Sequence, residues 1–337
     1  MNELAALGSD DIVLVTGGTG FTGSVLVRRL CELGCTVRVV ARASSNRSHL
    51  SDLPVEWING DVYDASVVEP AVEGVSYIFH VAAAYREAKI SDDIYRLVHI
   101  ESTKILANAA LKNPSFKRFL HVSTVGVLGH IDNPPANEST PYNPGDIYQE
   151  TKTVAETWII DFSNETGLPI TIVRPAAIYG PGDRRLLKVF KMAKLPVIPV
   201  IGFSKGLYHL IHVEDLVAFM ILSARHNNAL GETYICGNPQ AISIKGIIEV
   251  IANCLGNKAR YIRVPAWPFF MLGWLCEVIC KPLNIEPPIY RRRVAFFTKD
   301  RSFDTTKMRE QTGYQYLYSD EEGLVATAKW YLENKWM

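Results

Sequence analysis

The sequence predicts an α/β protein built on a doubly wound parallel sheet, with helices on both faces and a small, interleaved, mainly helical C-terminal lobe. Three observations predict this fold class. Short apolar runs alternate with helical segments through the first half of the chain, which is the pattern of repeated βαβ units. A glycine-rich loop follows the first apolar run, and the regular alternation ends after Pro175.

The predicted strands are short runs of apolar and β-branched residues. They are Ile12–Thr16, Thr36–Ala41, Val55–Asn59, Val75–Val81, Arg118–Ser123 and Ile170–Arg174. The segments between them carry apolar residues at helical spacing. The clearest helices are Phe21–Leu33, Asp92–Lys112 and Ile147–Thr166. Because crossovers between parallel strands are right-handed, these elements predict one doubly wound sheet.

Beyond Pro175 the predicted elements become shorter and less regular. Helices are expected over Glu214–His226 and Ser243–Leu255, and strands over Glu232–Cys236 and Arg260–Val264. Because strand signals recur this late, we expect the chain to return to its first domain. That domain is predicted to comprise residues 1–180 together with 211–240, and a second lobe to comprise 181–210 and 241–337.

The composition excludes several classes of protein. The 337 residues include 35 Lys and Arg against 35 Asp and Glu, and 48% are hydrophobic, so a sizeable core is expected and a disordered chain is excluded. The balanced charge argues against a nucleic-acid partner. The six cysteines form no CxxC pair and no Cys/His cluster at zinc spacing. We therefore expect no metal site and reduced thiols in a cytoplasmic protein.

A glycine-rich loop, TGGTGFTG, lies between the first predicted strand and the first predicted helix. Gly17, Gly20 and Gly23 have the G-x-x-G-x-x-G spacing. Such glycines permit a tight turn, a close approach of backbone to a pyrophosphate, and close packing of helix on strand, while the helix N-terminus attracts phosphate. The loop predicts a Rossmann dinucleotide site. The other loop residues expected to contact the dinucleotide are Thr19, Phe21 and Thr22.

The residues after the second and third predicted strands bear on which dinucleotide binds. A site selective for NAD usually has an acidic residue after the second strand, and none occurs between residues 37 and 51. Arg42, with Ser44 and Arg47 nearby, could instead hold a 2′-phosphate; the alternative is a solvated basic loop. We expect NADP(H) to be preferred, with NAD(H) as the alternative. Asp61, followed by Val62, could accept from the adenine amino group or cap the next helix.

Tyr148 and Lys152 form a Tyr-x-x-x-Lys pair on a predicted helix. Residues four apart share a helix face, so the ammonium can lie beside the phenol and stabilise its ionised form. Ser123 and Thr124 end the fifth predicted strand, at the edge where such sheets bind ligands. One of these hydroxyls is expected to orient a substrate oxygen toward Tyr148. Thr124 is the first choice and Ser123 the second.

These motifs together resemble the extended short-chain dehydrogenase/reductase family, also called the NAD-dependent epimerase/dehydratase family. The resemblance covers nearly the whole chain and runs through TGGTGFTG, GDV, HVAAAY, HVSTVGVLG, YQETK, VRPAAIYGPGD, HVEDL and RSFDTTKMREQTGY. It implies that Tyr148 is the general acid/base, that Lys152 also binds the nicotinamide ribose, and that Thr124 is the hydroxyl partner. Further cofactor contacts implied by the resemblance are Ala82, Ala83, Pro175 and Ile178.

Three departures from the family pattern affect the substrate. Residues 99–103 read HIEST where the family often has Asn-Val-x-Gly-Thr. Tyr208 aligns where nucleotide-sugar epimerases carry an arginine that holds the diphosphate, and FTKDR at 297–301 replaces an Arg-Pro-Gly-Asp stretch. Two expected diphosphate anchors are therefore missing. The arginines that could substitute are Arg184, Arg185, Arg291, Arg292, Arg293 and Arg301.

The resemblance is closest to the 3β-hydroxysteroid dehydrogenase, dihydroflavonol reductase and hopanoid-associated epimerase-like members. It implies an NAD(P)-dependent oxidoreductase that moves a hydride between nicotinamide and a secondary alcohol or ketone, on an apolar ring substrate. The alternatives are a nucleotide-sugar 4-epimerase or dehydratase with tightly bound NAD, and an NADP-binding regulatory protein. The expected substrate contacts are Tyr85, Thr124, Tyr148, Tyr179 and Tyr208.

Two apolar features suggest contacts beyond the substrate. The segment 265–280 is the most apolar in the chain and too short to span a bilayer. It could form a substrate wall or a peripheral membrane contact through 266–280; the alternative is a core or dimer helix. The helices predicted over Asp92–Lys112 and Ile147–Thr166 carry apolar residues on more than one face. Family resemblance implies that they pair with their copies in a homodimer.

Overall fold

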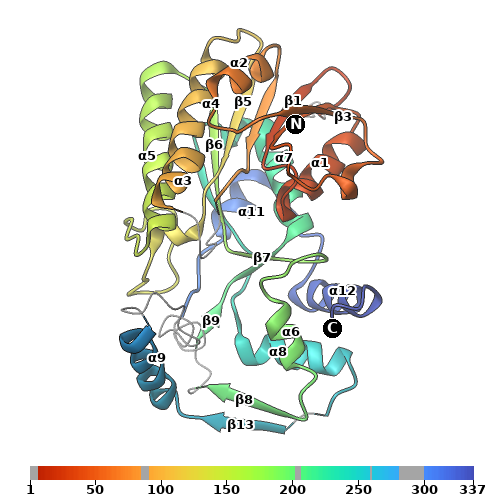
Figure 1. Cartoon of the computed structure of the whole chain (residues 1–337), viewed down its shortest axis with the longest axis vertical. Helices are drawn as coiled ribbons and strands as arrows, with labels where there is room; N and C mark the ends of the chain where they lie inside the picture. The colour runs from red at the N-terminus through yellow and green to blue at the C-terminus, as the bar shows by residue number, and fades with distance from the viewer. Residues whose placement is uncertain (1–6, 85–90, 202–205, 259, 281–299) are drawn as a thin grey trace.

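A seven-stranded parallel sheet forms the centre of the protein in the computed structural model, which describes residues 7–84, 91–201, 206–258, 260–280 and 300–337 (Figure 1). The strand order is β11-β6-β5-β4-β1-β2-β3. The strands are β1 (Ile12–Thr16), β2 (Thr36–Ala41), β3 (Val55–Asn59), β4 (Tyr77–His80), β5 (Arg118–Val122), β6 (Ile170–Pro175) and β11 (Thr233–Cys236). The predicted doubly wound sheet is confirmed. The late strand β11 pairs with β6, so the chain does return to the sheet.

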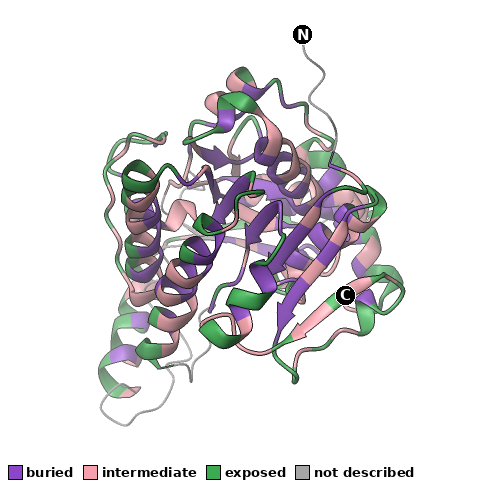
Figure 2. Cartoon of the chain, turned by 90° about the horizontal axis from the view of Figure 1, so that it is seen from above, coloured by how far each residue is buried: buried purple, intermediate pink, exposed green. Residues whose placement is uncertain are grey.

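Helices cover both faces of this sheet and bury a separate apolar core on each. One face is covered by α1 (Phe21–Glu32), α7 (Val213–Arg225) and α11 (Thr306–Thr312); the other by α2 (Ala65–Val72), α4 (Ser102–Leu111) and α5 (Ile147–Thr166). In the view from above, the strands in the middle of the sheet are largely buried, while the outer faces of the helices are exposed (Figure 2); the edge strand β3 is only partly buried. Both layers therefore shield the sheet from water.

The order of the strands opens a crevice beside β1. This strand lies between β4 and β2, with Thr16 opposite His80 of β4 on one side and Val40 of β2 on the other. The chain winds outward in opposite directions from this point, and such a switch point is where open α/β sheets bind ligands. The glycine loop after β1 and residues 81–84 after β4 therefore meet at the same edge.

A second group of elements lies below the carboxyl edge of the sheet in Figure 1. Its helices are α6 (Leu187–Met192), α8 (Ile244–Cys254), α9 (Trp267–Cys280) and α12 (Asp320–Glu333). Its short strands form the pairs β10 (Leu210–His212) with β7 (Ala177–Tyr179), β12 (Ile242–Ser243) with β9 (Leu207–Tyr208), and β13 (Arg260–Val264) with β8 (Val197–Ile201). The predicted helical lobe is present, and of these short strands only β13 was predicted. The residue boundaries of the two domains stay a prediction.

One helix predicted to be continuous is interrupted by a π-helical turn. The segment expected as a single helix from Asp92 to Lys112 consists of α3 (Asp92–Arg96), a π-helical turn η2 (Leu97–Glu101) and α4. Such turns insert an extra residue into a helix and often lie at functional sites. The other short turns, η1 (Ser48–Leu50), η3 (Val125–Leu128) and η4 (Asn227–Ala229), are 3₁₀ turns. Within the described part of the chain, no helix has both the length and the apolar character needed to cross a membrane.

Candidate functional site

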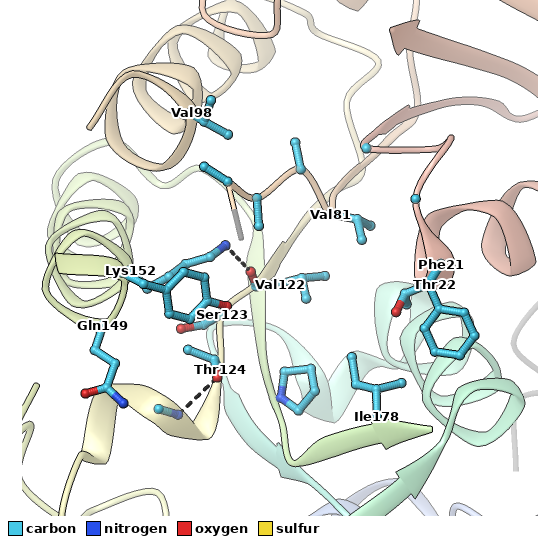
Figure 3. A pocket seen from close by; sticks show the side chains of 18 of the residues that line it. Phe21, Thr22, Val81, Val98, Val122, Ser123, Thr124, Gln149, Lys152 and Ile178 are labelled. Atoms are coloured by element: carbon cyan, nitrogen blue, oxygen red, sulfur yellow. Dashed lines mark hydrogen bonds between the residues drawn. The ribbon is translucent and has the colours of Figure 1, made fainter. Parts of the chain in front are cut away.

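A cavity of about 1140 Å³ runs along the carboxyl edge of the sheet. In Figure 3, Phe21 and Thr22 of α1 lie on one side of it, and Ser123, Thr124 and Lys152 lie on the other. The predicted site residues that line it are Gly17, Thr19, Gly20, Phe21, Thr22, Gly23, Arg42, Asp61, Val62, Ala82, Ala83, Ser123, Thr124, Tyr148, Lys152, Pro175, Ile178 and Tyr208. The fold thus brings residues from eight separate segments of the sequence to one cavity.

The glycine loop leaves no room for a side chain at Gly17 or at Gly23. Gly17 has φ +71°, and a Cβ there would lie 2.8 Å from the backbone of Ala82. A Cβ on Gly23 would lie 2.1 Å from the carbonyl oxygen of Gly17. The first turn of α1 has no side-chain cap and no acidic residue, so its N–H groups can bind an anion. This cradle fits the diphosphate of a dinucleotide, which Gly17, Gly20 and the start of α1 would hold.

The two arginines after β2 have different environments. Arg42 is exposed at the cavity wall, and among the described residues no protein group binds its guanidinium. Arg47 donates to Asn59 Oδ1 at 2.5 Å and its guanidinium lies 4.5 Å from the centre of the Trp57 ring. Arg47 therefore ties β2 to β3, which leaves Arg42 as the cation of this pair that could meet a 2′-phosphate. Ser44 is exposed and does not line the cavity, whereas Ser45 does.

Lys152 is a buried ammonium on α5. Its Nζ donates to the carbonyl oxygen of Val122 at 2.8 Å, and its side chain is fully enclosed with Tyr148 one turn earlier on the same helix. Burial lowers the pKa of Lys152 to about 8, while the nearby Glu156 carboxylate acts in the opposite direction. The group therefore stays mainly protonated at neutral pH, which is the state that favours ionisation of a neighbouring phenol.

The two hydroxyls after β5 are not equivalent. The Ser123 hydroxyl donates to the Glu156 carboxylate in a short hydrogen bond. Thr124 Oγ1 instead accepts from the backbone N–H of Gly126 at 3.0 Å and begins the turn η3. Its own hydrogen is not used in that bond. Thr124 is therefore the hydroxyl that can donate to a substrate oxygen.

A buried network behind the cavity was not predicted. Arg174 donates to Glu156 Oε1 through Nη2 at 2.6 Å and through Nε at 2.9 Å, and Tyr142 donates to the same oxygen at 2.9 Å. The side chains of Glu156 and Arg174 are 0% and 4% exposed. Glu156 follows Lys152 by four residues, so the helical repeat contained a signal for it. The partner Arg174, on β6, could be found only from the fold.

The remaining expected substrate residues have mixed placements. Tyr208 lines the cavity. Tyr179 does not: it is fully buried in the core of the lower elements, with its ring edge-on to His212 at 5.3 Å. Residue 85, expected as a substrate tyrosine, and Arg291 to Arg293, expected as alternative anion anchors, lie outside the described residues.

Comparison with known proteins agrees with this geometry. The model of the NAD-dependent epimerase/dehydratase family matches residues 13–237. The chain belongs to this family. Its predicted membership in an NAD(P)-dependent enzyme family, also named the extended short-chain dehydrogenases/reductases, is confirmed.

Three similar proteins illustrate the family. A protein named putative dihydroflavonol 4-reductase from Synechocystis sp. is 29% identical over 317 residues, covering 90% of both chains. The 3β-hydroxysteroid dehydrogenase/Δ5→4-isomerase of Mycobacterium tuberculosis is 29% identical over 340 residues, covering 95% of this chain and 90% of its own. The crystal structure of gox2253 has a TM-score of 0.80 and 27% identity, with 97% and 99% coverage.

Proposed function

We propose that this family member is a dehydrogenase or reductase that prefers NADP(H) and acts on a secondary alcohol or ketone in an apolar ring compound. The observation that carries the proposal is the chemistry of the cavity wall. Outside the glycine loop, much of the lining is apolar or aromatic: Ile94, Val98, Ile131, Leu186, Tyr208 and Phe303. Such a wall suits a fused-ring substrate with few polar groups.

One of the arginines that could bind a diphosphate, Arg185, already binds protein groups. Arg185 lines the cavity, but its Nε donates to Asp183 at 2.8 Å and its Nη2 to the carbonyl oxygen of Ile178 at 2.7 Å. With Tyr208 where an arginine was expected, this part of the wall offers little for a nucleotide-sugar diphosphate. Similarity to proteins named for dihydroflavonol and 3β-hydroxysteroid substrates supports the same class.

The roles of the residues follow from their positions. Bound nicotinamide would supply or accept the hydride. Tyr148 would transfer the proton of the substrate hydroxyl, Lys152 would keep the phenol acidic, and Thr124 would hold the substrate oxygen toward Tyr148. Arg42 would bind the 2′-phosphate of NADP(H).

The test is a substrate panel with purified protein. NADPH oxidation should occur with 3-ketosteroids or dihydroflavonols, and no NAD(H) should remain bound after purification. A UDP-sugar epimerised without net cofactor consumption, by protein that retains NAD(H), would overturn the proposal. Arg301 lines the cavity and is the observation that favours this alternative, a nucleotide-sugar 4-epimerase or dehydratase.

We also propose a homodimer through α4 and α5. Leu106 and Ile159 face the sheet and are fully buried, whereas Val154 on α5 is 47% exposed. Ile94 and Val98, two of the apolar residues that do not face the sheet, line the cavity. The exposed apolar face of α5 is what supports a self-complementary contact with a second copy.

A peripheral membrane contact through 266–280 is the last part of the proposal. Helix α9 leaves Trp267, Trp274 and Ile279 more than half exposed, and the preceding strand exposes Arg260 and Arg263, so apolar and basic groups lie together as at lipid surfaces. Co-sedimentation should increase with anionic vesicles and drop for Trp274→Glu; equal sedimentation of the wild-type protein and this variant would refute the contact.

All six cysteines are free thiols, which supports a cytoplasmic location.

A further inference from the structure

His99 connects the cofactor side of the cavity with the catalytic helix. It lies in the π-helical turn η2 and is completely buried. Its Nε2 accepts from the backbone N–H of Ala84 at 3.0 Å, and its Nδ1 lies 2.8 Å from Thr151 Oγ1 on α5. Ala84 lines the cavity directly after Ala82 and Ala83. One imidazole therefore spans the two walls.

These contacts determine the protonation state of the ring. A backbone N–H can only donate, so Nε2 carries no hydrogen, and a neutral ring must carry it on Nδ1. The Thr151 hydroxyl donates to the carbonyl oxygen of Ile147 at 2.8 Å and is therefore free to accept from Nδ1–H. Burial lowers the pKa of His99 to about 2, with Lys152 acting in the same direction. Burial therefore favours the neutral ring, and the hydrogen bonds place its one hydrogen on Nδ1.

His99 also contacts the ring of Tyr148. The two ring centres are 5.4 Å apart and the rings are nearly perpendicular, at 83°. Tyr148 precedes Thr151 by three residues on α5, so both face the same side of the helix. Thr103 donates to the carbonyl oxygen of His99 at 2.6 Å. This bond holds the turn on which His99 lies.

A second buried histidine secures the other end of the same helical segment. His80 Nδ1 lies 2.7 Å from Thr16 Oγ1, and Nε2 lies 3.1 Å from the hydroxyls of Ser102 and Thr103. Thr16 immediately precedes Gly17 and accepts from the backbone N–H of Ala82 at 3.3 Å. The segment from η2 to α4 is thus tied to the glycine loop as well as to α5.

We propose that His99 is a positioning residue: it holds the cofactor-facing backbone at Ala84 and the helix that carries Tyr148 in one fixed relation. The part that concerns Tyr148 rests on the function proposed above. The part that concerns the cofactor does not, because Ala84 and its neighbours line the cavity whichever reaction the enzyme performs.

The discriminating variant is Thr151→Val, which removes the acceptor for His99 and leaves the ring in place. Thr157→Val is its matched control: Thr157 lies on the same helix and makes the same type of bond, to the carbonyl oxygen of Thr153 at 3.0 Å, without contacting His99. NADPH and NADH affinities are measured by titration without substrate. Thr151→Val should weaken binding about two- to tenfold, the range expected for one neutral hydrogen bond, and Thr157→Val should not change it.

Two outcomes would overturn the proposal. One is equal cofactor affinity in Thr151→Val and Thr157→Val. The other is a ¹⁵N histidine spectrum that places the hydrogen of His99 on Nε2. The variant His99→Leu should repeat the loss of affinity, and its unfolding temperature shows whether it is folded. These measurements need no substrate, so they stand apart from the proposed reaction, which fails separately if Tyr148→Phe remains active.

Discussion

Tyr148 is the residue whose oxygen the proposed reaction depends on most. In Tyr148→Phe the ring still packs beside His99, but no group remains to transfer the proton. Turnover should fall about 10²- to 10⁴-fold while NADPH affinity stays nearly unchanged. Steady-state assays measure the turnover and a titration measures the NADPH affinity. Tyr261→Phe, a substitution outside the cavity, is the control. More than a tenth of the wild-type rate would rule out the assigned role.

Ser123 and Thr124 are adjacent, yet their removal should have different effects. Thr124→Ala removes a hydroxyl directed at the substrate and should lower kcat about 10²-fold, the loss typical of one such donor, with recovery in Thr124→Ser. Ser123→Ala leaves a Glu156 oxygen without its donor, so it should cost about 1–3 kcal/mol of unfolding free energy and less activity. Chemical denaturation and kinetics on both variants decide the matter; the reverse pattern would make Ser123 the substrate partner.

Arg42 is the residue that we propose determines the cofactor preference. A 2′-phosphate bound to it should contribute roughly 1.5–3 kcal/mol, so Arg42→Ala should weaken NADPH binding about ten- to a hundredfold and leave NADH binding unchanged. The exposed Arg28, paired with Asp52 at 2.7 Å away from the cavity, provides the control Arg28→Ala. An unchanged NADP/NAD ratio would show that Arg42 is only a solvated charge.

Helix α5 has two functions at the level of elements. Its inner face carries Tyr148 and Lys152 to the cavity and Glu156 to the buried network behind it, and its outer face is proposed to meet a second copy. Val154→Glu should place a buried charge in that interface and give a monomer by light scattering, whereas Leu332→Glu, on the exposed side of α12, should not. A wild-type mass of 37.6 kDa at micromolar concentration would refute the dimer.

The whole molecule should lose stability in mild acid. Five histidines are buried with lowered pKa values, mainly because burial disfavours the charged ring: His80 to about 3, His99 to about 2, His212 to about 4, and also His121 and His209. The unfolded chain binds these protons below about pH 6.5 and the folded chain does not, so unfolding free energy is lost as pH falls. Each such group contributes up to about 1.4 kcal/mol per pH unit.

His121 provides the sharpest test of this acid sensitivity. Neither of its ring nitrogens has a hydrogen-bond partner among the described residues. His121→Leu should therefore be neutral or stabilising near pH 7.5 and should flatten the fall in unfolding free energy between pH 6 and 5. Denaturant titrations at several pH values measure this, with the exposed His49→Gln as control. An unchanged slope would mean that His121 does not remain neutral in the folded protein.

The sequence by itself determined the local features that repeat along the chain. The short runs of apolar and β-branched residues identified β1, β2 and β3 with their boundaries, because strands of a parallel sheet are rich in such residues and are flanked by turns. The glycine spacing located the cradle, because the turn itself requires Gly23, where a Cβ would meet the carbonyl oxygen of Gly17; the contact of Gly17 with Ala82 became visible only in the fold. Tyr148 and Lys152 could be paired, since residues four apart on a helix share a face.

Only the tertiary structure decided which side chains meet across the sheet. The hydrogen bond from Ser123 to Glu156, which favours Thr124 as the proposed substrate hydroxyl, is visible only in the fold, and Glu156 is itself held by Arg174 from strand β6. Arg42 and Arg47 cannot be told apart from the sequence; in the structure they differ because Arg47 contacts Trp57 and Asn59. His99 occupies a position where another residue type was expected, and its partners Ala84 and Thr151 are 15 and 52 residues away. Contacts of this range depend on the packing of whole elements, which local periodicity does not encode.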